Sequence, residues 1–104
     1  MKLSTWAGKS SFNYTGSVAT GTEITFGEER KVTVTKKQYA DLRKHFLKRI
    51  VAVGTSKTDI PKDSIGEWLK DNVKGAAITS YVAAILVSEE YAERIEKHHI
   101  RVVR

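Results

Sequence analysis

The sequence predicts an α+β fold, in which an N-terminal antiparallel β-hairpin or small meander packs on three to four helices and a short C-terminal strand ends the chain. Two observations lead to this prediction. Up to residue 34, apolar residues alternate with polar ones, which is the period of half-buried strands. From residue 35 onwards they recur every three or four residues, which is the period of helices. The length of 104 residues suits a single domain, 1–104.

The N-terminal third contains the predicted strands. Two alternating apolar runs in 22–34 flank a short turn that contains Gly27, which indicates a β-hairpin. The preceding segment, 1–21, is rich in Ser, Thr and Gly and forms either short strands or a loosely ordered arm; its three aromatic residues favour strands. Trp6 in this segment has two interpretations. We favour packing over one end of the core, and the alternative is an exposed ring that stacks on a base or anchors a partner.

A helix is predicted over 35–51. Thr35 and Gln38 have the spacing of a capping box, in which both side chains bond to free backbone N–H groups at a helix start. One apolar stripe follows at spacings of three, four and four residues, and it consists of Tyr39, Leu42, Phe46 and Ile50. The opposite face carries lysine and arginine residues.

The second half of the chain is predicted to be mainly helical. A loop over 54–63 precedes a second capping-box pattern, Ser64 and Glu67, which starts a helix that ends near Gly75. The buried side of this helix is expected to carry Ile65, Trp68, Leu69 and Val73. The uncharged segment 76–87 predicts a helix buried on most sides, which 88–95 restarts or continues. Alternation over 98–104 predicts the final strand.

Composition excludes several classes of protein. The chain has no cysteine, so it is neither a disulfide scaffold nor a thiol enzyme. The longest uncharged apolar run, 75–87, is shorter than the roughly 20 residues that span a bilayer. We therefore expect a cytoplasmic protein with no membrane partner. His45, His98 and His99 match no metal-binding spacing, so we expect no metal and no cofactor.

The positive charge is concentrated in one segment. The net charge is +6, and residues 1–52 hold ten cationic side chains against four acidic ones, whereas residues 53–104 hold eight of each. Six of the cationic residues lie in 36–49 with a single acidic one. Lysine and arginine on one helix face are typical of surfaces that neutralise phosphates. The leading prediction is a small non-catalytic protein that binds nucleic acid through this helix, with the candidate contacts Lys37, Arg43, Lys44, Lys48, Arg49 and Lys57.

Three alternatives stay open. The cationic face could dock on an acidic protein partner, which would make the chain an adaptor or inhibitor, with the N-terminal strands supplying a free edge. The apolar helix over 76–87 is compatible with a homodimer. A ligand site or small enzyme could use the 54–63 loop, although the sequence shows no set of nucleophile, base and orienting group and we predict no catalysis. A helix-turn-helix over 64–96 is disfavoured, because its second helix would present apolar side chains to the bases.

Overall fold

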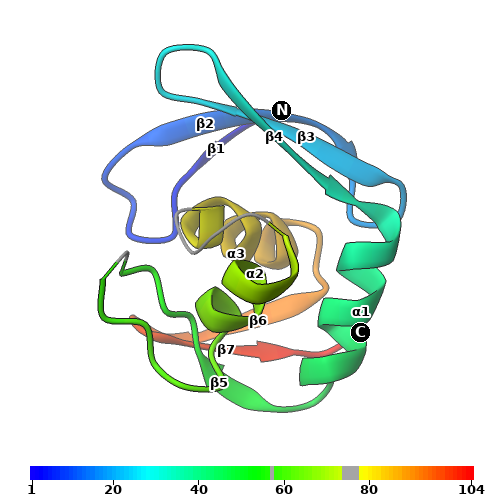
Figure 1. Cartoon of the computed structure of the whole chain (residues 1–104), viewed down its shortest axis with the longest axis vertical. Helices are drawn as coiled ribbons and strands as arrows, with labels where there is room; N and C mark the ends of the chain where they lie inside the picture. The colour runs from blue at the N-terminus through cyan, green and yellow to red at the C-terminus, as the bar shows by residue number, and fades with distance from the viewer. Residues whose placement is uncertain (57, 74–77) are drawn as a thin grey trace.

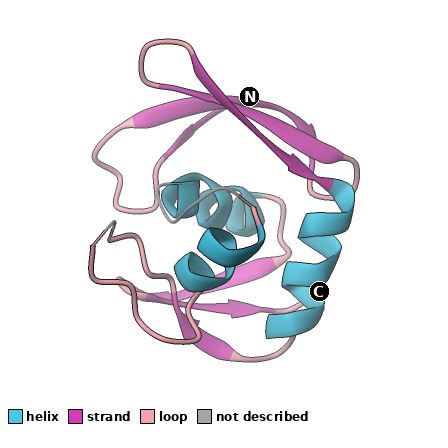
Figure 2. Cartoon of the chain, in the orientation of Figure 1, coloured by secondary structure: helices cyan, strands magenta, loops and turns pink. Residues whose placement is uncertain are grey.

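Two antiparallel sheets enclose two helices, and a third helix closes one side of the assembly (Figure 1). The computed structural model describes residues 1–56, 58–73 and 78–104. Within these residues the chain forms seven strands and three helices. Figure 2 shows the magenta sheets on opposite sides of the molecule, with α2 and α3 between them. The predicted α+β class, with an N-terminal antiparallel meander, is therefore confirmed, whereas the second sheet is larger than the single strand we predicted.

The first sheet is a four-stranded meander in the order β1-β2-β3-β4. Its inward side chains alternate with exposed ones, and Ile24 and Val34 are almost fully buried. The predicted hairpin is confirmed as β3 and β4, and the turn between them places Gly27 and Glu29 at positive φ. The bounds of the strands are Lys2–Ser4 (β1), Ser11–Ser17 (β2), Gly21–Phe26 (β3) and Arg30–Thr35 (β4).

The N-terminal segment forms strands whose aromatic side chains lie in the core. Phe12 and Tyr14 of β2 are 2% and 3% exposed. Trp6 is 5% exposed, and its indole Nε1 donates a hydrogen bond of 2.7 Å to the carbonyl of Lys97. The favoured interpretation of Trp6, packing over one end of the core, is confirmed. The alternative of an exposed stacking ring is wrong.

Helix α1, Lys36–Phe46, begins as predicted and ends earlier than predicted. Thr35 Oγ1 accepts from the N–H of Gln38 (3.1 Å), and the Gln38 side chain accepts from the N–H of Thr35 (2.8 Å), which completes the capping box. After Phe46 the backbone turns through Lys48, at φ 63°, into β5, Ile50–Ala52. Val51 is buried in β5 opposite Ile100, so pairing with a distant strand ends the helix. The predicted stripe therefore loses Ile50, which is 55% exposed.

Helix α2, Ile65–Asn72, begins at Ser64. The Ser64 hydroxyl accepts from the N–H of Glu67 (3.1 Å), but the Glu67 carboxylate accepts from the N–H of Asp63 (2.9 Å) rather than from Ser64. Only half of the second predicted capping box forms. Ile65 and Leu69 are buried as predicted, whereas Trp68 and Val73 are half-buried. The predicted end at Gly75 lies outside the described residues.

Helix α3, Thr79–Ser88, lies between the two sheets and buries Val82, Ile85 and Leu86 completely. This matches the predicted buried helix over 76–87, of which 76 and 77 lie outside the described residues. The apolar surface that suggested a homodimer is thus largely covered by the chain's own sheets, and the homodimer stays a prediction. The side chains of α3 that face the core are apolar and buried, which argues against α3 as a recognition helix.

The segment after α3 was predicted to be helical and is a strand instead. The helix ends at Ser88, Glu90 has φ 66°, and β6, Ala92–Glu96, pairs with β7, His99–Val102. Glu89 therefore lies at the C-terminal end of α3, not at the N-terminal end of a new helix. Its carboxylate accepts hydrogen bonds from the Tyr14 hydroxyl (2.7 Å) and from the N–H of Val18 (3.0 Å), which anchors the turn to the meander.

The second sheet has the order β5-β7-β6, and β7 confirms the predicted final strand. Its central strand buries Ile100 and Val102 against the helices. Among the helices of the described residues, none is long and apolar enough to cross a membrane.

Candidate functional site

Helix α1 presents its cationic side chains because its other face is committed to the core. Tyr39, Leu42 and Phe46 are each 0% exposed. The solvent-facing side carries Lys37, which pairs with Asp41 one turn later at 2.9 Å. Both partners of this ion pair are exposed, so the pair contributes little to stability.

Two arginines are held against one aromatic ring beside the last turns of α1. The Arg43 guanidinium carbon lies 4.4 Å from the ring centroid of Tyr91, and that of Arg104 lies 4.7 Å from the same centroid. Arg43 Nε donates to the main-chain oxygen of Arg104 (2.6 Å). Arg104 donates from Nε and NH2 to the main-chain oxygens of Glu90 and Glu89 (3.0 and 3.2 Å). Figure 1 shows the C-terminus beside α1, consistent with these contacts.

The contacts around Tyr91 orient the two arginines. Neither arginine pairs with an aspartate or glutamate side chain of the described residues. Of the three guanidinium nitrogens of Arg43, Nε is the one with a hydrogen-bond partner among the described residues. Its two terminal nitrogens therefore remain available to a ligand. An arginine that is already oriented loses less conformational entropy when it binds an anion.

Lys36, Lys44 and Lys48 are exposed, and none of them forms an ion pair with any residue that the structure describes. Lys48 follows α1, and its N–H donates to the carbonyl of Val102 (2.6 Å), so it lies beside the C-terminal strand. We define the cationic surface as Lys36, Arg43, Lys44, Lys48 and Arg104.

Arg49 does not belong to this surface. Its guanidinium donates to the carboxylate of Asp63, and His45 lies 3.5 Å from the same carboxylate. The hydrogen bond from Arg49, followed by the contact with His45, holds the pKa of Asp63 below its ordinary value. Of the predicted nucleic-acid contacts, Lys37 and Arg49 are thus paired within the chain, and Lys57 lies outside the described residues.

Acidic residues line a groove between α1 and α2. The groove has a volume of about 330 Å³ and is lined by Asp63, Glu67 and Asp71 around the half-buried Trp68. Arg49 and His45 contact the carboxylate of Asp63, and Lys44 borders the adjoining pocket beside Trp68. The remaining carboxylates, Glu67 and Asp71, disfavour an anionic ligand in the groove itself.

The 54–63 loop borders a pocket of about 560 Å³ that includes Ser56, Asp59, His98 and His99. The Ser56 hydroxyl accepts from the N–H groups of residues 58 and 59 (3.3 and 3.0 Å), so it stabilises a turn. The imidazole Nδ1 of His99 lies 2.7 Å from the carboxylate of Glu96, whose pKa this contact lowers. Across the described ranges no serine bonds to a histidine, and no three potential metal ligands cluster.

Sequence reasoning missed Tyr91 because it assigned 88–95 to a helix. The ring instead follows the positive-φ turn at Glu90 and contacts Arg43 of α1 and Arg104. Comparisons with protein-family models, with curated proteins and with solved structures find no match for this chain.

Proposed function

We propose that this protein is a non-catalytic nucleic-acid-binding module whose contact site is the cationic surface. The observation that supports this most strongly is the placement of Arg43 and Arg104 against Tyr91, which orients two guanidinium groups that pair with no aspartate or glutamate side chain of the described residues. Arginine side chains fixed in this way are typical of sites that recognise phosphate.

The length of the surface favours an extended polyanion over a single small anion. Helix α1 has 11 residues and is therefore about 16 Å long. One strand of a duplex carries a phosphate about every 3.4 Å along the helix axis, so this length spans about five phosphates. Three residues of the cationic surface lie on α1 itself, and Lys48 and Arg104 extend the row of charges beyond its C-terminal end.

The surface is expected to bind without strong sequence preference. Base recognition in a groove uses side chains with paired donors and acceptors, such as the amides of Gln and Asn. The one amide on α1, Gln38, already bonds to Thr35 and to the carbonyl of Asn72 (3.3 Å). Lysine and arginine contacts to phosphate supply affinity and a strong dependence on salt.

An acidic protein partner is the alternative ligand for the cationic surface. Salt separates the two ligands, because release of condensed counterions from a duplex makes log K fall by about 0.9 per phosphate contact for each tenfold rise in salt. A protein interface centred on apolar contacts shows a much weaker dependence.

The test is fluorescence anisotropy with labelled 20-base-pair DNA, single-stranded DNA and RNA between 50 and 200 mM salt. The informative variant is Lys44→Gln/Lys48→Gln, since neither side chain has an ion pair within the described structure. The matched control is Lys62→Gln/Lys70→Gln, which removes the same charge from the loop before α2 and from α2. Both control lysines are exposed.

We expect the Lys44→Gln/Lys48→Gln variant to bind duplex DNA roughly tenfold more weakly for each removed contact near 0.1 M salt. The slope of its log K against log salt should be shallower than that of the wild type by about 1.8. The control variant should lose much less. If the wild-type chain shows no binding to any of the three nucleic acids at 50 mM salt, or if both variants lose equal affinity, the proposal is wrong.

A further inference from the structure

Strand β1 leaves one side of its backbone open. It lies at the edge of the meander and pairs only with β2. Met1 exchanges two main-chain hydrogen bonds with Tyr14 (2.8 and 2.9 Å). Because bonded and non-bonded residues alternate along an antiparallel strand, Lys2 and Ser4 direct their N–H and C=O groups away from β2. Within the part of the chain that the structure describes, these groups have no hydrogen-bond partner.

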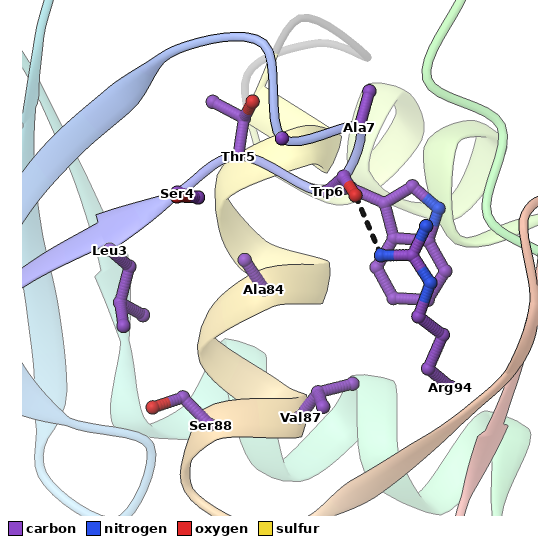
Figure 3. Close-up of a pocket in the computed structure, with 10 residues that line it drawn as sticks. Leu3, Ser4, Thr5, Trp6, Ala7, Ala84, Val87, Ser88 and Arg94 are labelled. Carbon is purple, nitrogen blue, oxygen red and sulfur yellow. Dashed lines mark hydrogen bonds between the residues drawn. The ribbon is translucent and has the colours of Figure 1, made fainter.

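A pocket of about 430 Å³ lies beside this free edge. Figure 3 shows its apolar lining, with Leu3 on one side, Ala84 and Val87 of α3 beneath, and Trp6 with Arg94 on the other side. Leu3, Ala84 and Val87 are half-buried, so part of each side chain remains available to a ligand. We call the open edge and this pocket together the β1 groove.

Arg94 supplies a fixed positive charge at one end of the β1 groove. Its NH1 donates to the carbonyl of Trp6 (2.7 Å), and its guanidinium carbon lies 4.2 Å from the Trp6 ring centroid (Figure 3). Trp6 is itself fixed by the bond from its Nε1 to Lys97 and by the bond from its N–H to Ser80 (3.1 Å). Nε and NH2 of Arg94 have no partner among the described residues, so this edge of the guanidinium can accept a carboxylate in a two-bond geometry.

The charges near the groove also favour an acidic ligand. Lys2, in β1 itself, and Lys9, in the loop after β1, are exposed and form no ion pair with any described residue. Of the acidic residues of β6, Glu93 pairs with Arg101 at 2.6 Å, and Glu96 lies 2.7 Å from His99. Among the described residues that line the pocket, the one charged side chain is that of Arg94.

We propose that the β1 groove binds an extended, acidic segment of a partner protein by strand addition to β1. The backbone of the segment pairs with the open groups of Lys2 and Ser4, one of its apolar side chains enters the pocket beside Val87, and one of its carboxylates binds Arg94. A second copy of this chain is a poorer ligand. The edge strands of its first sheet carry Lys2 in β1 and basic residues 30 and 31 in β4, which would bring like charges together. Its edge strand β6 carries Glu93 and Glu96, but these already contact Arg101 and His99 of β7.

The probe for this site is a phage-displayed library of random eight-residue peptides, selected on the whole chain and followed by synthesis of the enriched sequences. We expect enriched peptides to combine an acidic residue with apolar residues at alternate positions. A library that yields no enriched sequence, or one without acidic residues, overturns the proposal.

Two pairs of variants then test the contacts. Ser4→Pro removes the N–H that points away from β2 and leaves the β1–β2 bonds in place, whereas Ser4→Ala keeps that N–H. Arg94→Gln removes the charge in the pocket, whereas Lys70→Gln removes an equal charge on α2. We expect Ser4→Pro and Arg94→Gln each to weaken binding of the selected peptide at least tenfold, and Ser4→Ala and Lys70→Gln to change it less than threefold. Equal affinity in all four variants overturns strand addition.

Amide hydrogen exchange tests the same claim on the unmodified chain. Adding the selected peptide should slow exchange at the amides of Lys2 and Ser4 at least tenfold, and unchanged exchange at both amides contradicts the proposal. Protection that appears without peptide and grows with protein concentration identifies a second copy as the occupant and also contradicts it. Nucleic-acid binding by Ser4→Pro should equal that of the wild type, so failure of the β1 groove and failure of the cationic surface are distinguishable.

Discussion

A buried hydrogen bond between Thr22 of β3 and Tyr39 of α1 ties the helix to the meander, and its contribution can be measured. The two hydroxyl oxygens are 2.6 Å apart, and the residues are 2% and 0% exposed. Neither hydroxyl has another partner within the described structure. Replacing one member buries the other hydroxyl without a partner, which costs about 1–3 kcal/mol. We therefore expect Tyr39→Phe and Thr22→Val each to lose that much free energy of unfolding.

The double variant, Thr22→Val/Tyr39→Phe, gives the opposite expectation. It leaves no polar group buried, and replacing both partners with apolar groups of similar shape is nearly neutral. We expect it to lose about 0–1 kcal/mol relative to the wild type, which is less than either single variant loses. Urea unfolding followed by tryptophan fluorescence measures all four free energies, with the denaturant slope as a check on two-state behaviour. A double variant that loses the sum of the two single losses refutes the reasoning.

Three further predictions concern single residues. Gly66→Ala would place a Cβ in a steric clash with the carbonyl oxygen of Gly54, so urea unfolding should show a loss of about 1–3 kcal/mol in the free energy of unfolding; an unchanged value contradicts the close packing. Burial, and then the hydrogen bond to Glu89, raise the pKa of Tyr14 to about 12 from an ordinary 10.0. Because the pKa of Tyr14 is higher in the folded state than in the unfolded state, the protonated hydroxyl stabilises the fold fully below pH 10, and this contribution is lost as the pH rises to 12. The Tm of Tyr14→Phe should therefore fall less between pH 10 and 12 than the Tm of the wild type. An equal fall in both proteins excludes this contribution. Lys48 has φ 63°, a left-handed conformation that strains a residue with a side chain. Lys48→Gly relieves this strain at an entropy cost, so its free energy of unfolding should rise by roughly 0.5–1 kcal/mol, and it should bind duplex DNA more weakly. A lower free energy of unfolding argues against strain at this residue.

Local patterns were sufficient where neighbouring residues decide the structure. The alternation around Ile24 and Val34 and the capping box at Thr35 depend on contacts within a few residues, and both predictions are confirmed. The buried helix α3 followed from an uncharged segment of sufficient length. The burial of Trp6 needed only the preference of large aromatic residues for the core.

The failures lie where strand pairing overrides a helical period. Ile50 continues a helical spacing, and Ile95 lies three residues after Ala92, so both segments fit the helical period. Pairing with β7 draws both into strands instead: β5 lies nearly 50 residues before β7 in the sequence, and β6 forms a hairpin with it. Propensity is a weak guide in such cases, because tertiary contacts override it.

The same limitation applies to the candidate site. The concentration of lysine and arginine on α1 was visible in the sequence, but the state of each side chain was not. Arg49 is paired with Asp63, 14 positions later, whereas Arg43 meets Arg104, 61 positions later, over the ring of Tyr91. Only the folded chain distinguishes an arginine that pairs with an acidic side chain from one that an aromatic ring and a main-chain oxygen orient.

The most direct test of the central claim is the salt dependence of duplex DNA affinity for the wild-type chain and for Lys44→Gln/Lys48→Gln. If all five residues of the cationic surface contact phosphates, the slope of log K against log salt should be about −4.5 for the wild type and about −2.7 for the variant. A slope near zero, or an equal slope in both proteins, would contradict binding of a nucleic-acid backbone by this surface.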